Sequence, residues 1–113
     1  MKSKILALSK NEDFKNLLQK KKASNKYVTI FYGILDNKDI EKLNISFVTK
    51  KKLGNAVKRN KIKRRLKNII NEAVKINSIK FKYSYLVIAK PTMLNNEFKK
   101  IKETLFQSLK EIR

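Results

Sequence analysis

The chain has 113 residues, 42% of them hydrophobic, which suits one compact domain and is too short for two of ordinary size. With 29 Lys and Arg against 9 Asp and Glu, its formal net charge is +20, so nucleic acid is the first expected partner and an anionic membrane the second. The absence of Cys and His excludes disulfides, thiolate nucleophiles, zinc fingers and most self-sufficient hydrolytic sites.

The N-terminus has a basic start and one short apolar run, Ile5 to Leu8, before the acids Glu12 and Asp13. This pattern is neither a signal peptide nor a membrane span, so we expect a cytoplasmic protein. A first helix is predicted from about Lys10 to Lys20, because apolar residues recur there at helical spacing. Ser9 and Glu12 indicate a capping box at its start.

Two strands are predicted next, after the basic, polar stretch from Lys20 to Lys26. The run Tyr27 to Tyr32 is β-branched or aromatic at every position, which favours a strand covered on both faces. Residues 36–39 are typical of a turn. Leu43 to Thr49 then predicts a second strand, running antiparallel to the first.

A second helix is predicted from about Asn55 to Ile76. Turning each residue by about 100° places five apolar side chains on one stripe: Ile62, Leu66, Ile69, Ile70 and Ala73. The opposite side carries Asn60, Arg64, Lys67 and Asn71, with Lys61 beside them.

A third strand, Tyr83 to Ala89, is followed by a last helix from about Asn95 to Ile112. The predicted inner face of that helix consists of Phe98, Ile101, Leu105, Phe106 and Leu109. The order α-β-β-α-β-α predicts an α+β sandwich in a single domain over residues 1–113.

The positive charge is concentrated in one segment. No acid occurs between Glu41 and Glu72, and three of the four arginines lie there. A solvated helix face would alternate Glu with Lys, so this pattern favours a phosphate-binding face. Just before the helix, Gly54 can take an unusual backbone conformation and Asn55 can act as the N-cap, which directs the positive helix end toward a loop of lysines.

The segment Val48 to Lys67, VTKKKLGNAVKRNKIKRRLK, resembles the signature segment of the bacterial ribonuclease P protein subunit. The similarity extends to Lys10–Phe14 (KNEDF) and to Tyr85–Pro91 (YLVIAKP), so it covers nearly the whole chain in order and at family length. Lys61 and Lys67 stand where the family usually has Arg. Both keep the charge but lack the planar fork needed for bidentate contacts.

In that family the catalytic component is an RNA, and the protein helps to bind precursor tRNA at its 5′ leader and supports productive metal binding. The resemblance therefore implies a subunit of a tRNA 5′-leader endoribonuclease, whose partners are the catalytic RNA and precursor tRNA rather than DNA or a membrane. It also implies that the holoenzyme uses Mg²⁺ through its RNA, with neither a metal cage nor a catalytic residue in this chain.

The resemblance also implies two sets of site residues. The basic helix and its entry loop would face RNA through Lys50, Lys51, Lys52, Asn55, Arg59, Asn60, Lys61, Lys63, Arg64 and Lys67. A cleft between the sheet and the first helix would hold the single-stranded leader against Phe14, Leu18, Tyr27, Phe31, Ser46 and Val48. Aromatic faces stack on any base, although Phe and Leu at helical spacing are more often core residues.

The family fold implies a central, mostly antiparallel sheet with three helices in the order α-β-β-(β)-α-β-α. It also implies a left-handed crossover around the basic helix, whereas about 98% of βαβ connections are right-handed.

Three alternative functions explain less of the sequence. A ribosomal-protein-like structural RNA binder explains the charge but not the three matching segments in order. A helix-turn-helix DNA regulator needs a second helix where strands flank the basic helix. A peripheral membrane protein would need the apolar stripe that the sheet requires as its core.

Overall fold

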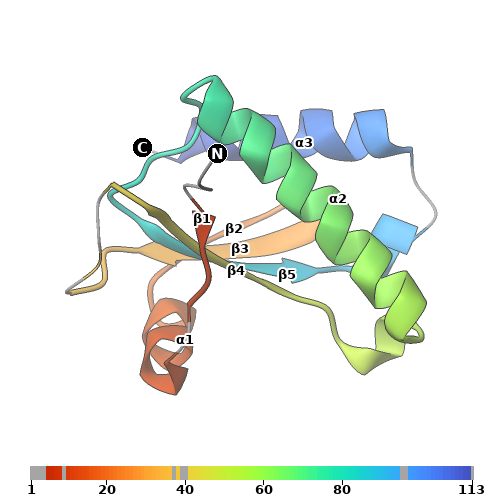
Figure 1. Cartoon of the computed structure of the whole chain (residues 1–113), viewed down its shortest axis with the longest axis horizontal. Helices are drawn as coiled ribbons and strands as arrows, with labels where there is room; N and C mark the ends of the chain where they lie inside the picture. Colours follow the sequence, from red (N-terminus) through yellow and green to blue (C-terminus); the bar gives the residue numbers. More distant parts are fainter. Residues whose placement is uncertain (1–4, 9, 37, 39–40, 95–96, 113) are drawn as a thin grey trace.

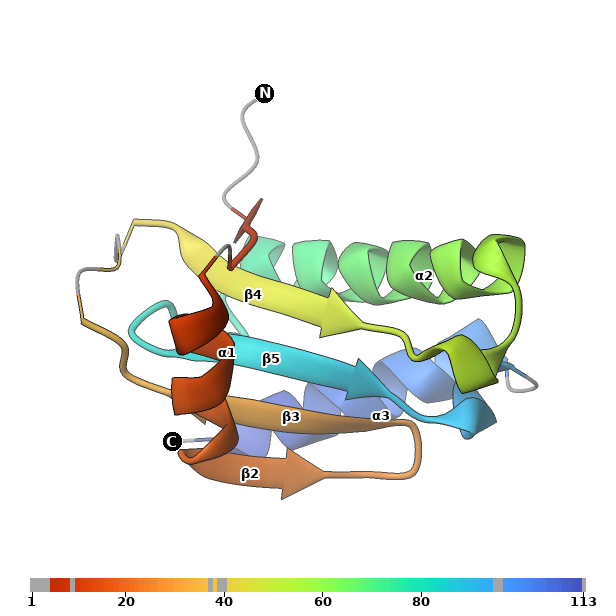
Figure 2. The same cartoon turned by 90° about the horizontal axis from the view of Figure 1, so that it is seen from below.

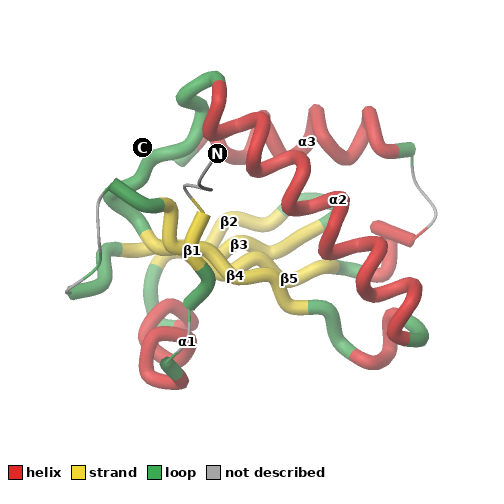
Figure 3. The backbone as a smooth tube through the Cα atoms, viewed as in Figure 1, coloured by secondary structure: helices red, strands yellow, loops and turns green. Residues whose placement is uncertain are grey.

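The computed structural model describes residues 5–8, 10–36, 38, 41–94 and 97–112. Figure 3 shows the strands gathered into one sheet with the helices outside it. In chain order the elements are β1 (Ile5–Leu6), α1 (Asn11–Leu18), β2 (Lys21–Ser24), β3 (Val28–Gly33), β4 (Leu43–Val48), the 3-10 helix η1 (Lys51–Leu53), α2 (Ala56–Lys75), β5 (Ser84–Ala89), the 3-10 helix η2 (Pro91–Leu94) and α3 (Phe98–Glu111).

The sheet is mixed and has the strand order β1-β4-β5-β3-β2. β4 runs parallel to β1 and β5, whereas β3 is antiparallel to β5 and β2. The antiparallel ladders hold more residue pairs than the parallel ones, so the predicted α+β class and mostly antiparallel sheet are confirmed. β3 and β4 run in opposite directions, as predicted, but the apolar β5 lies between them because a central strand must bury both faces.

The connection from β4 through α2 to β5 is left-handed. In Figure 2 both strands point to the right, β5 lies below β4, and α2 lies behind the sheet, away from α1. A path along β4, back through α2 and down to β5 therefore turns left-handedly. This geometry, expected from the family resemblance alone, is confirmed.

α2 and α3 cover one face of the sheet, and α1 crosses part of the other (Figure 1). Successive strand side chains point to opposite faces, which produces two apolar clusters. The larger lies under α2 and α3 and contains the whole predicted stripe of α2. The smaller lies under α1 and contains Leu8, Leu17, Leu35 and Leu86, with Phe14, Phe31, Val48 and Ile88 partly buried against it.

The predicted inner face of α3 is also confirmed. Ile101, Leu105 and Leu109 are buried, and Phe98 and Phe106 are partly buried against the larger cluster. The predicted start at Asn95 lies outside the described residues, as do Asn37 and Asp39 of the predicted turn.

The predicted capping box depends on Ser9, which lies outside the described residues. Among the described residues, the N-cap of α1 is Lys10, and its side chain forms no capping hydrogen bond. Glu12 and Asp13 instead lie in the first turn, where negative charge stabilises a helix N-terminus through its dipole. Asp13 also forms an ion pair with Lys38, with 2.6 Å between Oδ2 and Nζ.

Two strands were not predicted from the sequence. β2 is an edge strand whose exposed lysines hide a strand pattern and keep that edge in water. Asn25 turns the chain from β2 into β3, because its Oδ1 accepts from the backbone N–H groups of Tyr27 and Val28 at 2.8 and 2.9 Å. β1 has only 2 residues, too few for an alternating pattern to appear.

Candidate nucleic-acid interface

The junction between β4 and α2 carries the first group of predicted RNA-binding residues. Leu53 of η1 is buried and anchors the loop, while the side chains of Lys50 to Lys52 are exposed. Gly54 has φ +130°, which a residue with a side chain rarely adopts. Asn55 caps α2, because its Oδ1 accepts from the backbone N–H of Lys58 at 3.0 Å. The predicted conformations of Gly54 and Asn55 are thus confirmed, and the positive end of α2 opens onto this lysine loop.

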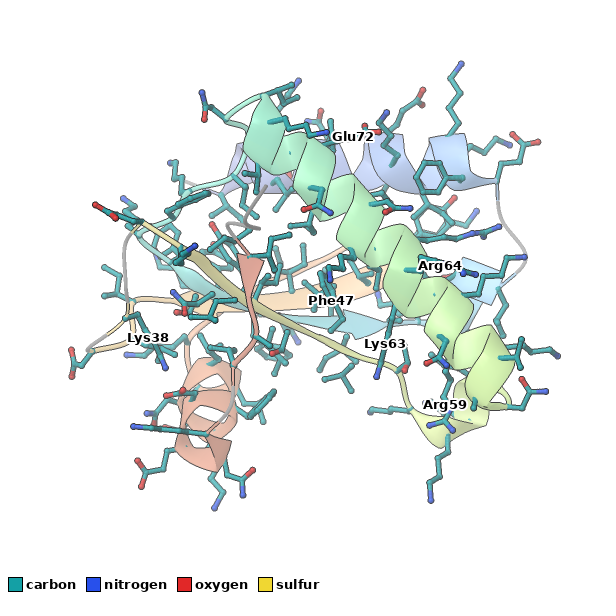
Figure 4. The ribbon with its side chains drawn as sticks, viewed as in Figure 1. Lys38, Phe47, Arg59, Lys63, Arg64 and Glu72 are labelled. Carbon is teal, nitrogen blue, oxygen red and sulfur yellow. The ribbon has the colours of Figure 1, made fainter. Side chains whose placement is uncertain are left out.

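The remaining predicted residues of α2 occupy different sides of the helix. Asn60 and Arg64 are exposed on the side away from the buried stripe. Lys61 and Lys63 are turned by about 200° relative to each other, so they project from opposite flanks. Lys63 is exposed, and Figure 4 shows it directed from α2 toward β4. The basic helix therefore presents an outward face and two separate flanks.

The flank that faces β4 carries a row of cations at helical spacing: Arg59, Lys63 and Lys67. Lys63 and Lys67 are exposed, and Arg59 is partly buried. At the start of this row, two buried polar atoms have no hydrogen-bond partner among the described residues, namely Thr49 Oγ1 and Arg59 Nε. A buried donor without a partner costs about 1–3 kcal/mol.

A groove of about 490 Å³ lies at the edge of β4, beyond the short pairing of β1 with Leu43 and Asn44. We call it the β4 groove; its lining residues are Ile5, Ala7, Phe14, Ile45, Ser46, Phe47, Val48 and Lys67. It brings together three residues of the predicted cleft with one cation of α2. Ser46 also positions the segment before α1, because its Oγ accepts from the backbone N–H of Leu8 at 2.8 Å.

The other predicted cleft residues do not line the groove. Leu18 is 50% exposed on α1, and Phe31 is partly buried in the smaller cluster on the same side of the sheet. The prediction for Tyr27 is wrong, because this ring is 3% exposed and belongs to the larger cluster on the opposite side. Tyr27 precedes β3 and lies in the turn formed by Asn25. The alternation of side chains along the strand therefore does not predict which face of the sheet its ring contacts.

Several residues in or near the β4 groove were not predicted from the sequence. Ile88 of β5 is partly buried on the α1 side, next to Val48 in the strand register. The spacing from buried Leu86 could have indicated its face, because alternate residues share one side of a strand. Ile5 and Ala7 could not have been identified in this way, because the β1 pairing that precedes the groove is too short to leave a pattern.

The third matching segment has a structural role. Lys90, which follows β5, donates through Nζ to Ser24 Oγ at 2.8 Å and to the carbonyl oxygen of Asn25 at 2.5 Å. These bonds tie the end of β5 to the turn between β2 and β3. The ammonium group of Lys90 therefore stabilises the fold, whereas the exposed lysines of α2 remain available to bind RNA.

Two further observations concern the described part of the chain. None of its helices is long and apolar enough to cross a membrane. No three of its His, Cys, Asp and Glu side chains gather closely enough to hold a metal ion.

Comparisons with known proteins agree with this architecture. The family model described as Ribonuclease P matches residues 3–113. A ribonuclease P protein component from Carboxydothermus hydrogenoformans is 36% identical over 112 residues, covering 96% of this chain and 91% of the relative. The corresponding protein of Mesoplasma florum is 35% identical over 98 residues, covering 87% of this chain and 86% of the relative.

Solved structures give the same result for the fold. The ribonuclease P protein from Thermotoga maritima superposes with a TM-score of 0.80 at 23% identity, covering 96% of this chain and 98% of that chain. The Staphylococcus aureus ribonuclease P protein has a TM-score of 0.77 at 27% identity, with 92% of each chain covered.

Proposed function

The chain belongs to the bacterial ribonuclease P protein family, and from this premise we propose that α2 binds the catalytic RNA while the β4 groove holds the 5′ leader of precursor tRNA. As a protein component of ribonuclease P it takes part in processing tRNA 5′ ends and works with the ribonuclease P RNA. The proposal concerns which surface meets which RNA. Its main support is the β4 groove, where apolar strand residues, Phe14 and Lys67 meet.

The outward face of α2 and the lysine loop suit a folded RNA. Their side chains are exposed cations and amides, and the described residues offer them no acidic partner in an ion pair. Each phosphate that they neutralise releases condensed counterions, which favours binding and makes it depend on salt. Arg64 adds a planar fork for bidentate phosphate contacts, which Lys cannot provide.

The β4 groove suits a single strand. Phe14 offers a ring on which a base of any identity can stack, and Val48 and Ala7 extend the apolar surface. Lys63 and Lys67 stand on the α2 side of β4, at a place where they can reach the phosphates of a strand lying in the groove. Paired bases cannot turn their faces toward such a surface, so the leader must be unpaired there.

The proposal assigns bond cleavage to the RNA subunit, with Mg²⁺ bound through that RNA. This chain contributes positioning: it neutralises phosphates of two RNAs and holds the leader beside the catalytic RNA. The proposal also assigns the protein to the cytoplasm, together with these two RNA partners.

Reconstitution tests the proposal. Nuclease-free protein, labelled precursor tRNA and a bacterial ribonuclease P RNA are combined at low magnesium, where we expect the protein to restore cleavage at the mature 5′ end. The protein alone is expected to leave the substrate intact, because it has no His or Cys to act as base or nucleophile. Specific 5′ cleavage without the RNA subunit would contradict the proposal. RNA binding without restored cleavage would favour a structural RNA binder.

A further inference from the structure

A second recess lies on the other flank of α2, between this helix and η2. We call it the η2 recess; it has a volume of about 310 Å³ and is lined by Lys58, Lys61, Ile62, Arg65, Met93 and Leu94. Lys61 projects about 200° away from Lys63, so α2 itself separates the η2 recess from the β4 groove. Neither Lys58 nor Arg65 belongs to the residues predicted from the family resemblance.

The floor of the η2 recess is apolar and its rim is cationic. Ile62 and Met93 are 2% and 0% exposed, and Leu94 is partly exposed above them. The backbone N–H of Met93 donates to the carbonyl oxygen of Lys90 at 3.0 Å, which holds η2 in position. The rim consists of Lys58, Lys61 and Arg65, which lie on one stripe of α2.

The charges on this rim are not balanced by the protein. Among the described residues, none that lines the η2 recess is acidic, and no ion pair involves Lys58, Lys61 or Arg65. About two turns farther along the same flank, Glu72 pairs with Lys102 of α3 at 2.5 Å. The only acid in α2 thus lies about two turns beyond the recess and is paired with α3. At the η2 recess itself, three positive charges lie close together and repel one another.

We infer that the η2 recess binds one nucleotide of the catalytic RNA, an inference that rests on the proposed function. Arg65 offers a planar fork to the phosphate, with Lys58 and Lys61 as point charges beside it. The exposed part of Leu94 offers an apolar surface to the ribose or to an unstacked base. The volume lies at the lower end of the range of about 300–1,000 Å³ for ligand pockets, which suits one nucleotide rather than a strand.

The position of the recess selects the catalytic RNA over the leader. The leader's groove lies along β4, and α2 stands between the two sites. An RNA that lies against the outward face of α2 reaches the rim of the η2 recess directly. Under this inference α2 is contacted by the catalytic RNA on its outward face and on its η2 flank, and by the substrate only on its β4 flank.

Equilibrium binding of in vitro transcribed ribonuclease P RNA tests the recess. Lys61→Ala/Arg65→Ala is expected to weaken binding about tenfold and to reduce the salt slope by about 2. The matched control is Lys99→Ala/Lys110→Ala, which removes the same charge from exposed positions of α3 and is expected to change affinity much less. Arg65→Lys should recover only part of the loss, because it restores charge without the fork.

If both double variants lose the same affinity for the catalytic RNA, with unchanged circular dichroism, the loss reflects total charge rather than a site at the η2 recess. That result would overturn the inference. If the unmodified protein does not bind the catalytic RNA, the proposed function fails instead. The two failures are therefore distinguishable.

Photo-crosslinking locates the contact without removing a charge. The chain has no Cys, so Leu94→Cys provides one attachment site for a benzophenone maleimide, and Lys110→Cys provides the control. The label at position 94 is expected to crosslink to one short region of the catalytic RNA, and the label at position 110 is not. Crosslinks from position 94 only to precursor tRNA, or none from a labelled protein that still binds the catalytic RNA, would overturn the inference.

Discussion

The two faces of the sheet serve different purposes although the same strands build both. On one face, α2 and α3 complete a large cluster in which Leu66, Ile69 and Ile101 have no exposed surface. On the other, α1 has only 8 residues and leaves Phe14, Val48 and Ile88 partly uncovered. Stability is therefore concentrated under the two long helices, and the part of the sheet itself that is available for binding is the part that the short helix does not cover.

α2 repeats this division within one element. Its buried stripe belongs to the core, whereas its remaining sides carry the charge. The apolar stripe packs into the core. The exposed cations on the outward face do not take part in this packing. Substitutions on the two sides of the sheet, or on the two sides of α2, should consequently change different measured quantities.

The largest expected effect is on the core aromatic that the sequence misassigned. Tyr27→Ala should lower the free energy of unfolding by about 3–5 kcal/mol, because it removes a buried ring from the larger cluster. Chemical denaturation measures this, and Tyr27→Phe, which keeps the ring, serves as the control. A small stability change with a selective loss of leader binding would return Tyr27 to the leader cleft.

Two substitutions on opposite sides of α2 separate stability from binding. Leu66→Ala should destabilise the protein by about 2–5 kcal/mol and leave the salt dependence of RNA binding by the folded protein unchanged. Arg64→Ala should weaken binding of the catalytic RNA and reduce the salt slope by about 1, with little change in Tm. Unfolding caused by Arg64→Ala, with the slope preserved, would show that the outward face is structural.

A third prediction concerns Phe14, which is partly buried between α1 and the β4 groove. Phe14→Ala should weaken binding of leader-bearing precursor tRNA by about 1–3 kcal/mol and leave binding of mature tRNA almost unchanged, because stacking in the β4 groove is lost. Affinities for both RNAs are measured with the same protein preparation. Equal losses for both, together with a large drop in Tm, would make Phe14 a core residue.

The smallest expected effect is at the edge of β4. Ser46→Ala removes the hydrogen bond from the Leu8 backbone and should cost about 0.5–1.5 kcal/mol of stability. Amide exchange at Leu8 should accelerate, while exchange in β5 should not. Unchanged exchange at Leu8 would show that the segment before α1 is held by other contacts.

The sequence predicted those features that depend on near neighbours along the chain. The stripe of α2, the Gly54–Asn55 junction and the inner face of α3 follow from helical geometry within a few turns, and the structure confirms all three. The failures are also local in origin. The lysines of β2 conceal an edge strand, and β1 is too short to show any pattern.

The candidate site was only partly predictable, because its residues come from distant parts of the chain. Phe14, Ser46 and Val48 share a groove as the family resemblance implied, but Lys67 joins them only because α2 lies over the β4 edge. Lys61, predicted together with Lys63, instead faces η2 with Arg65. A charge pattern shows that a helix is basic, and only its neighbours show what each basic side faces.

Composition and periodicity alone therefore determined that this is a basic α+β domain with one cationic helix, since charge and helical spacing are properties of the chain itself. The tertiary structure decided the face of Tyr27, the place of β5 between β3 and β4, the left-handed crossover and the separation of the two recesses. These features depend on which strands pair and on which side α2 returns. Strand pairing and the side of the return are determined by packing between residues far apart in the chain. They therefore cannot be predicted from the pattern of neighbouring residues.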